Sequence, residues 1–326
     1  TVTRPTTKMM PNTATNVVTK FMMHKYLISI VGPTGIGKTA LSLKLASHFD
    51  TDIISADSRQ FYKEIPIGTA APIPDELSVA PHHFIHHKSI KESYSVGAFE
   101  KEALEKLELL HSSNSVVVMV GGSGLYVNAV LKGFDEFPDI APEIRTQLNS
   151  ELESKGLEFL QEELKRLDPK SYETIALQNP HRVIRALEIC RGTGQPYASF
   201  LNKNRGQRNF KTISIGLKAD RPLIYERINN RVDQMIENGL LEEAKSVFED
   251  RDLNALNTVG YKELFNYFDG LWTLDFAISE IKKNTRRFAK RQMTWFQKDP
   301  ETQWFEYDTE LLDILDYLDK ELKKEV

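Results

Sequence analysis

The stretch YLISIVGPTGIGKTALSLKLA, from Tyr26 to Ala46, decides which fold this chain can adopt. Its first six residues are mostly apolar, which indicates a buried β-strand, and apolar residues at helical spacing follow Lys38. Between them lies a match to G-x-x-x-x-G-K-[ST], the pattern of a phosphate-binding loop (P-loop) between a strand and a helix. The loop consists of Gly32, Pro33, Thr34, Gly35, Ile36, Gly37, Lys38 and Thr39.

The residues of this loop suit an anionic ligand. The glycines let successive backbone N–H groups turn toward one phosphate, and the following helix presents its positive end to it. Lys38 can reach the outer phosphate, and the hydroxyl of Thr39 can ligate Mg²⁺. The loop does not identify the phosphate compound, because most such loops hold ATP or GTP whereas some hold the diphosphate of another substrate.

The composition is that of a globular protein with one large domain or two moderate ones. The chain has 326 residues, of which 40% are hydrophobic and 27% charged. The single cysteine, Cys190, excludes an intramolecular disulfide and a cysteine-based zinc site, and it fits a reducing, cytoplasmic compartment. No apolar run approaches the roughly 18 residues of a membrane span, so we expect no association with a membrane. We also expect the protein to be a monomer. Residues 1–24 contain no Asp or Glu and are interpreted as a disordered leader.

Apolar runs that alternate with helical patterns predict an α/β fold with a P-loop NTPase-like parallel sheet core. Strands are expected at residues 26–31, 52–55, 116–120 and 212–217. A long span separates the third strand from the fourth, and it holds helical stretches at 141–165, 168–177 and 180–192. We therefore predict a core formed by 25–133 and 210–326, with a helical insertion domain at 134–209 and a helical C-terminal part.

Two polar features are expected near the loop, at the carboxyl edge of the sheet. Asp57 follows the second strand, where it could hold Mg²⁺ through water or accept a proton from a nucleophile; an ordinary turn aspartate is the alternative. The third strand runs into Gly121-Gly122-Ser123-Gly124 rather than into the magnesium-holding Asp of an ATPase. This turn offers open backbone amides and the hydroxyl of Ser123, unless it is only a strand-to-helix connection.

Two basic segments could bind phosphate. Arg182 and Arg185 share one face of a predicted helix, where they could bind phosphates or simply pair with Glu188. The segment 282–298, KKNTRRFAKRQMTWFQK, has seven Lys or Arg, no acid and interleaved aromatics, in a chain of net charge −4. This local positive field suits a nucleic-acid backbone, unless acids elsewhere in the protein neutralise it.

Taken in order, these segments closely resemble the tRNA dimethylallyltransferases, also called tRNA isopentenyltransferases. The resemblance covers about residues 26–297, and no block except the P-loop is specific by itself. The matching blocks are GPTGIGKT, SADSRQFYKEIPIGTAAP, PHHFI, GGSGLYVNAVLKG, NPHRVIRALEICRGTGQP, RVDQMIENGLLEEAK, NTVGYKE and NTRRFAKRQMTWF.

The resemblance implies that a dimethylallyl group passes from dimethylallyl diphosphate to N6 of the adenosine 3′-adjacent to the anticodon. The P-loop, Lys38 and Mg²⁺ held by Thr39 would stabilise the departing diphosphate, and Asp57 would take the proton from N6. The target base would leave the anticodon stack to reach a buried pocket. The insertion and the basic C-terminal helix would grip the anticodon stem-loop.

The resemblance also implies roles for single residues. Ser123 would line the channel where the substrates meet, and Arg231 would act catalytically on the diphosphate side. The residues implied for the adenosine are Asp57, Ser58, Arg59 and Gln60. The residues expected to contact tRNA elsewhere are Arg145, His181, Arg182, Arg185, Val259, Gly260, Tyr261, Lys262, Arg286, Arg287, Lys290 and Arg291.

The chain departs from the family at two positions. Ser123 stands where the family usually has Thr, which keeps the hydroxyl and loses a methyl group. Ala71 stands where the family often has Lys, which removes a positive charge near the entrance.

Two other classes of function remain open at this point. A free adenine-nucleotide prenyltransferase or a small-molecule kinase would use the same loop, with Arg182 and Arg185 as a clamp on the nucleotide. A non-catalytic module would bind tRNA or ATP without turnover.

Overall fold

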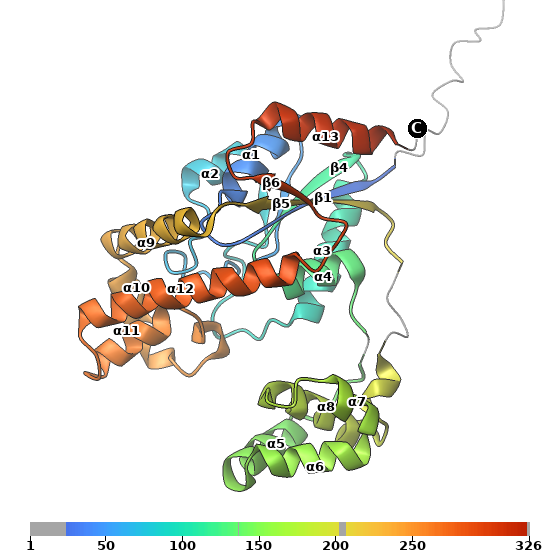
Figure 1. The fold of residues 1–326 in the computed structure, drawn as a ribbon, viewed down its shortest axis with the longest axis vertical. Helices are drawn as coiled ribbons and strands as arrows, with labels where there is room; N and C mark the ends of the chain where they lie inside the picture. The colour runs from blue at the N-terminus through green and yellow to red at the C-terminus, as the bar shows by residue number, and fades with distance from the viewer. Residues whose placement is uncertain (1–23, 136, 202–206, 325–326) are drawn as a thin grey trace, which may run out of the picture. The chain divides into compact units, whose positions relative to one another are not determined.

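Six parallel strands form one sheet in the order β3-β2-β4-β1-β5-β6 (Figure 1). The computed structural model describes residues 24–135, 137–201 and 207–324. The strands are β1 Tyr26–Val31, β2 Ile53–Ser55, β3 His82–His83, β4 Val116–Val120, β5 Lys211–Lys218 and β6 Gln303–Glu306. The predicted α/β fold with a parallel sheet core is confirmed.

The central strand β1 sets the register of the sheet. Tyr26 lies opposite Val116 of β4 on one side and Lys211 of β5 on the other, and all of β1 is buried. Continuous apolar strands of this kind are typical of parallel sheets covered on both faces. Because β1, β4 and β2 are adjacent and parallel, the segments that follow them meet at one edge of the sheet.

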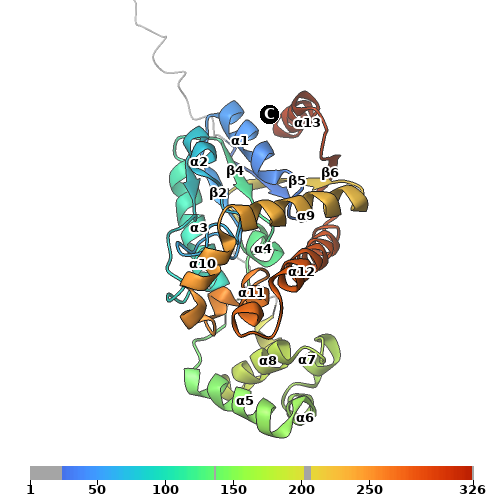
Figure 2. The ribbon, with the colours of Figure 1, turned by 90° about the vertical axis from the view of Figure 1, so that its left-hand side faces the viewer.

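The α-helices follow the strands in the chain order predicted for an α/β protein (Figures 1 and 2). They are α1 Lys38–Phe49, α2 Pro74–Val79, α3 Val96–Leu110, α4 Gly124–Lys132, α5 Pro142–Lys155, α6 Leu157–Leu167, α7 Pro169–Thr174, α8 Pro180–Thr193, α9 Arg221–Glu237, α10 Leu240–Ser246, α11 Tyr261–Phe268, α12 Leu274–Phe296 and α13 Leu311–Lys323. Among the described helices, none is long and apolar enough to cross a membrane.

The described chain divides into two compact units. The first comprises the described residues up to Tyr94, Glu102–Gly124, and the residues from Asn209 onward; the second comprises Ser95–Lys101 and Leu125–Arg208. In the first unit, one core joins the strands to α1, α9 and α13, and a second core lies among α9, α10, α11 and α12. These last four helices pack against one another in sequence order and then back onto α9.

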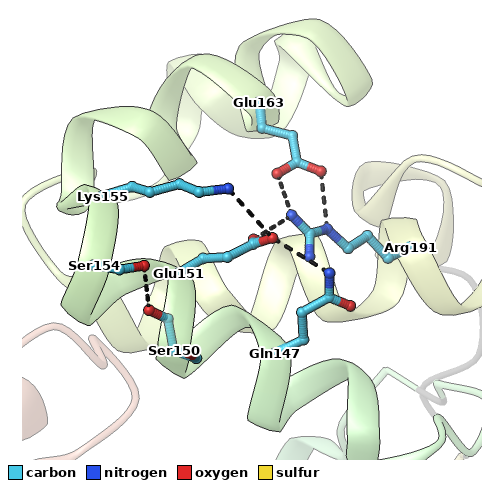
Figure 3. A network of polar contacts seen from close by, with 7 residues as sticks. All are labelled: Gln147, Ser150, Glu151, Ser154, Lys155, Glu163 and Arg191. Atoms are coloured by element: carbon cyan, nitrogen blue, oxygen red, sulfur yellow. Dashed lines mark hydrogen bonds and ion pairs between the residues drawn. The ribbon is translucent and has the colours of Figure 1, made fainter.

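The second unit is a small helical bundle held by an apolar core and one ion network. Leu148, Leu160 and Leu187 belong to the buried core of α5, α6 and α8. Arg191 of α8 binds Glu163 with Nε at 2.9 Å and Nη2 at 2.5 Å, and Nη2 also lies 2.6 Å from a carboxylate oxygen of Glu151 (Figure 3). One guanidinium thus joins α5, α6 and α8.

The elements differ from the sequence expectation at three places. The helical stretch expected at 141–165 is helical but consists of two helices: α5 and α6 are separated by Gly156, whose φ of 83° interrupts the helix. The short strands β3 and β6 were not expected, because two or four residues at a sheet edge carry little periodicity. The expected leader lies outside the described residues except for its last residue, His24.

Candidate active site

Three chain segments meet where β1, β4 and β2 end. The P-loop follows β1, the turn Gly121–Gly124 follows β4, and Asp57 follows β2 by two residues. Backbone hydrogen bonds fasten them: Gly121 N–H donates to Ile30 O at 3.2 Å, and Ala56 N–H donates to Val120 O at 2.8 Å. The sequence-predicted Lys38, Asp57 and Ser123 therefore lie on loops that share one sheet edge.

The glycines of the P-loop adopt backbone conformations that favour glycine. Gly37 caps α1 with a φ of 110°, which a residue with a Cβ rarely adopts. Lys38 Nζ donates to Pro33 O at 2.8 Å, so the lysine folds back over its own loop. Arg227 of α9, which the sequence reasoning missed, donates from Nε to Gly35 O at 2.7 Å. Its position four residues before Arg231 on one helix was the available signal.

The surroundings of Lys38 change its pKa. Burial, together with the positive charge of Arg231, lowers the pKa of Lys38 to about 7, although the Asp57 carboxylate acts in the opposite direction. Burial also lowers the pKa of Arg231, again opposed by Asp57. Burial and a nearby like charge both disfavour the charged form of a lysine. The site is therefore electrostatically ready for an anionic ligand.

Asp57 and Ser123 are held by the segment that follows β2. Asp57 Oδ1 accepts the N–H of Arg59 at 3.0 Å, which is the turn geometry of the ordinary alternative. Its Oδ2 faces Gly122, where a Cβ would lie 3.8 Å away. Ser123 Oγ accepts Ser58 N–H at 2.9 Å and donates to Ser58 Oγ at 3.0 Å. The half-buried carboxylate thus lies beside the Ser123 turn.

Gln60 and Arg231 meet at one short loop. Gln60 Nε2 donates to Thr69 O at 3.3 Å and to Ala70 O at 3.2 Å, and its Oε1 accepts the Ser55 hydroxyl at 3.2 Å. Arg231 Nη2 donates to the same Ala70 O at 3.3 Å. The residue expected at the adenosine and the arginine expected at the diphosphate therefore share an acceptor.

Gln292 of α12 connects the two loops of the site and was missed by the sequence reasoning. Its Oε1 accepts Thr34 N–H at 2.9 Å, and its Nε2 donates to Gly122 O at 2.8 Å. The side chain is buried, as are Ala289 and Phe296 on the same helix face. An amide at that spacing among buried apolar residues was the signal that could have found it.

The basic helix α12 is only partly neutralised by acids. Lys282 binds Asp233 at 2.6 Å and Lys283 binds Glu280 at 2.7 Å. Arg286 donates to Asn229 Oδ1 at 2.7 Å and keeps a half-buried position. The exposed members are Arg287, Lys290, Arg291 and the aromatic residues Phe288 and Trp295. The helix presents cations and rings together on the surface of the first unit.

In the second unit, the expected arginines have internal partners. Glu188 Oε2 accepts Arg145 Nη1 at 3.0 Å and Arg185 Nη1 at 2.9 Å, so the alternative of pairing with Glu188 holds for Arg185. Both arginines remain more than 40% exposed, with side-chain values of 46% and 41%. Arg182 and His181 are exposed on α8, the helix that also carries Arg185. The ion pairs leave donor atoms of both arginines on the surface.

The block Val259-Gly260-Tyr261-Lys262 is divided between core and surface. Tyr261 is fully buried, and its hydroxyl donates to Glu243 Oε1 at 2.5 Å. Gly260 N–H donates to Glu263 Oε2 at 2.8 Å, and Lys262 is exposed. Of the block's two long polar side chains, that of Lys262 reaches solvent whereas that of Tyr261 supports the interior.

The chemistry of the P-loop fits a magnesium–phosphate ligand. Thr39 offers a hydroxyl oxygen in the first turn of α1, half-buried and next to Lys38. Hard oxygen donors supplemented by substrate phosphates are the usual setting for Mg²⁺. Across the residues that the structure describes, no group of three His, Cys, Asp or Glu could hold a metal.

Comparisons with known proteins identify the family to which the chain is similar. The family model described as IPP transferase matches residues 60–299. The chain is 60% identical over 300 residues to a tRNA dimethylallyltransferase of Christiangramia forsetii, covering 92% of this chain and 99% of the relative. It is 56% identical over 308 residues to the same-named protein of Flavobacterium johnsoniae, covering 93% and 100%.

Two solved structures are also similar. A tRNA isopentenylpyrophosphate transferase of Bacillus halodurans is 38% identical, with a TM-score of 0.69 over 92% of this chain and 97% of that one. A eukaryotic dimethylallyltransferase, described as acting on tRNA, is 27% identical, with a TM-score of 0.76 over 91% of this chain and 80% of that one.

Proposed function

The chain belongs to the IPP transferase family, and from that premise we propose that it is a tRNA dimethylallyltransferase. It transfers the dimethylallyl group of dimethylallyl diphosphate to N6 of the adenosine 3′-adjacent to the anticodon in tRNA and releases diphosphate. The observation that carries this proposal is the meeting of the P-loop, Asp57 and the Ser123 turn at one sheet edge. An anion cradle and a candidate base then face the same small space.

The P-loop serves the leaving group. As the bond between the allylic carbon and the diphosphate oxygen breaks, negative charge grows on the diphosphate, and backbone amides, Lys38 and Arg231 stabilise it. Thr39 would hold Mg²⁺, which supplies further neutralisation of the diphosphate when bound. The lowered pKa of Lys38 means that this lysine gains its full charge when the diphosphate arrives.

Asp57 serves the acceptor. The N6 nitrogen forms the new bond to the allylic carbon, and one N6 proton passes to the Asp57 carboxylate. Oδ1 is already oriented by Arg59 N–H, which leaves Oδ2 toward the Gly122 side of the site. Ser58, Gln60 and the hydroxyl of Ser123 border the place where the extruded base would sit.

The remaining cationic surface serves tRNA. On the first unit, Arg287, Lys290, Arg291 and Lys262 are exposed, and Arg286, Val259 and Gly260 lie beside them in the same helices and turn. On the second unit, the cationic candidates are Arg145, Arg182 and Arg185, together with His181. Arg59 belongs to the base-side segment. Such sets bind the phosphate backbone without reading sequence.

The decisive experiment measures transfer of labelled dimethylallyl to an anticodon stem-loop with adenosine at that position. We expect transfer by the wild type and a fall in kcat of about 10²- to 10⁴-fold for Asp57→Asn, with diphosphate binding retained. A stem-loop with guanosine at that position, and free AMP, are the control acceptors. Equal turnover with AMP would instead assign a free-nucleotide prenyltransferase, and full activity of Asp57→Asn would exclude this base.

A further inference from the structure

The loop from Pro66 to Ala71 is fastened by one carboxylate, that of Glu243 in α10. Glu243 Oε2 accepts Ile67 N–H at 2.7 Å, and Oε1 accepts Gly68 N–H at 2.8 Å and the Tyr261 hydroxyl at 2.5 Å. Charge-assisted bonds of this kind are about twice as strong as neutral ones. Three donors on one anion fix the start of the loop against α10 and α11.

Tyr261 packs directly against the backbone of the loop at Gly68. Its ring is fully buried and leaves no room for a Cβ at Gly68, so the loop backbone lies directly on the ring. Burial and the nearby Glu243 carboxylate raise the pKa of Tyr261, so the hydroxyl stays protonated and remains a donor.

The far end of the same loop contacts the active site. Ala70 has a φ of 47°, and its carbonyl accepts Arg231 Nη2 at 3.3 Å and Gln60 Nε2 at 3.2 Å. Thr69 O accepts the same Gln60 amide at 3.3 Å. Any shift of the loop changes where Arg231 and Gln60 point.

We propose that Glu243 and Tyr261 form a positioning pair, which holds the Pro66–Ala71 loop so that Arg231 faces the diphosphate and Gln60 faces the acceptor base. Tyr261, which the family resemblance implied as a tRNA contact, is fully buried, so in this proposal both it and Glu243 act through the loop backbone rather than on a substrate. The inference rests on the proposed function for the identity of the two substrates. Ala71, which stands where the family often has Lys, is the last residue of this loop. In this chain the bonds from Glu243 and Tyr261 therefore position a loop that carries no lysine at that place.

The first test is Glu243→Gln, which puts an amide donor against at least one of the three donors that the carboxylate now satisfies. Binding of inorganic diphosphate is measured by calorimetry without tRNA, and transfer is measured at saturating stem-loop. We expect both the Kd for diphosphate and the KM for dimethylallyl diphosphate to rise about tenfold, with kcat reduced and stem-loop affinity changed less than about threefold. Glu242→Gln, at the exposed neighbouring glutamate, is the matched control and should match the wild type.

A double-mutant cycle separates positioning from general stability. In an Arg231→Lys background, Glu243→Gln should reduce the diphosphate affinity little further. The reason is that the bonds of Glu243 to the Pro66–Ala71 loop affect diphosphate binding through the Arg231 guanidinium, which this background lacks. Tyr261→Phe keeps the buried ring and removes only the hydroxyl, so it should show the same effects more weakly in a folded protein. A lower melting temperature with unchanged Kd and KM, or losses that multiply fully in the Arg231→Lys background, would overturn the positioning role.

Failure of this inference is distinguishable from failure of the proposed function. Diphosphate binding does not require transfer of the dimethylallyl group. The diphosphate affinities in the double-mutant cycle therefore test the Glu243–Tyr261 pair whichever acceptor the enzyme uses. A Glu243-dependent diphosphate affinity in a protein that modifies no stem-loop would support the positioning pair and refute the tRNA substrate.

Discussion

At the scale of single residues, the site depends on Lys38 having a pKa far below that of a free lysine. Burial and Arg231 favour the neutral amine and lower the pKa of Lys38 to about 7. A bound diphosphate favours the ammonium form, so binding above pH 7 must be accompanied by uptake of a proton. The charge of Lys38 therefore depends on whether diphosphate is bound.

This predicts a pH dependence of diphosphate affinity. Above pH 7 the Kd of the wild type should rise by up to about tenfold per pH unit relative to that of Lys38→Arg, because the arginine stays charged. Calorimetry at pH 6.5, 7.5 and 8.5 checks the ratio, which cancels the titration of the ligand itself. Parallel pH profiles for the two proteins would show that Lys38 is already charged in the empty site.

At the scale of elements, the buried face and the exposed face of α12 contribute differently to the protein. Its buried face carries Gln292, which joins the P-loop to the Ser123 turn. Its exposed face carries cations and aromatic rings. A single rigid helix therefore links the surface expected to bind tRNA to both loops of the site.

The buried face gives a prediction for Gln292→Ala. The substitution leaves Thr34 N–H and Gly122 O without their partners, which costs about 1–3 kcal/mol for each buried group that stays unsatisfied. We expect a lower free energy of unfolding and a fall in kcat/KM of about 10- to 100-fold, since both loops lose their shared support. Gln297→Ala, at an exposed position just beyond the helix, is the control. Unchanged kcat/KM in Gln292→Ala would contradict the link.

The exposed face gives a prediction on salt dependence. Replacing Arg287, Lys290 and Arg291 by Ala should weaken stem-loop binding. It should also reduce the slope of log K against log salt by about 0.7–0.9 for each phosphate that the variant no longer neutralises. Lys283→Ala is the control, because Glu280 already neutralises that lysine. Filter binding at several salt concentrations checks the slope. A slope equal to the wild type would show that this face binds no phosphate.

At the scale of the whole molecule, the two units have separate stabilising interactions. The first relies on a buried parallel sheet, whereas the second adds the Arg191 network to a smaller core. The side chains of Arg191, Glu151 and Glu163 are only 19%, 15% and 13% exposed. Removing one partner of such a group leaves poorly hydrated charges behind.

Arg191→Met should therefore destabilise the second unit alone. We expect a loss of about 3 kcal/mol, seen as faster hydrogen exchange in α5, α6 and α8, with diphosphate binding by the first unit unchanged. Arg166→Met, at an exposed arginine of α6, is the control.

The loss should also depend on pH. The hydrogen bond from Arg191 lowers the pKa of Glu151, so its contribution is present above the unfolded pKa, about 4.5, and is lost as the pH falls further. The difference between Arg191→Met and the wild type should therefore shrink in acid. Equal hydrogen exchange in α5, α6 and α8 at neutral pH would contradict the role of the network.

The expected strands at 26–31 and 116–120 coincide with β1 and β4, because long buried strands are continuous apolar runs that need no partner to be visible in a sequence. The helical stretch expected at 141–165 is divided at Gly156, which the sequence did not indicate, because the positive φ of Gly156 is a property of the folded backbone. The roles proposed for individual site residues remain predictions.

The α/β class, the P-loop and the order of the family's blocks can be predicted from the sequence, because they follow from local apolar periodicity and from residue types at fixed spacing. The contacts of Gln292 with the P-loop and the Ser123 turn become visible only in the folded chain, as do those of Glu243 and Tyr261 with the loop behind Arg231 and Gln60. Those contacts join segments far apart in the chain, and buried polar groups find their partners only when folding brings such segments together.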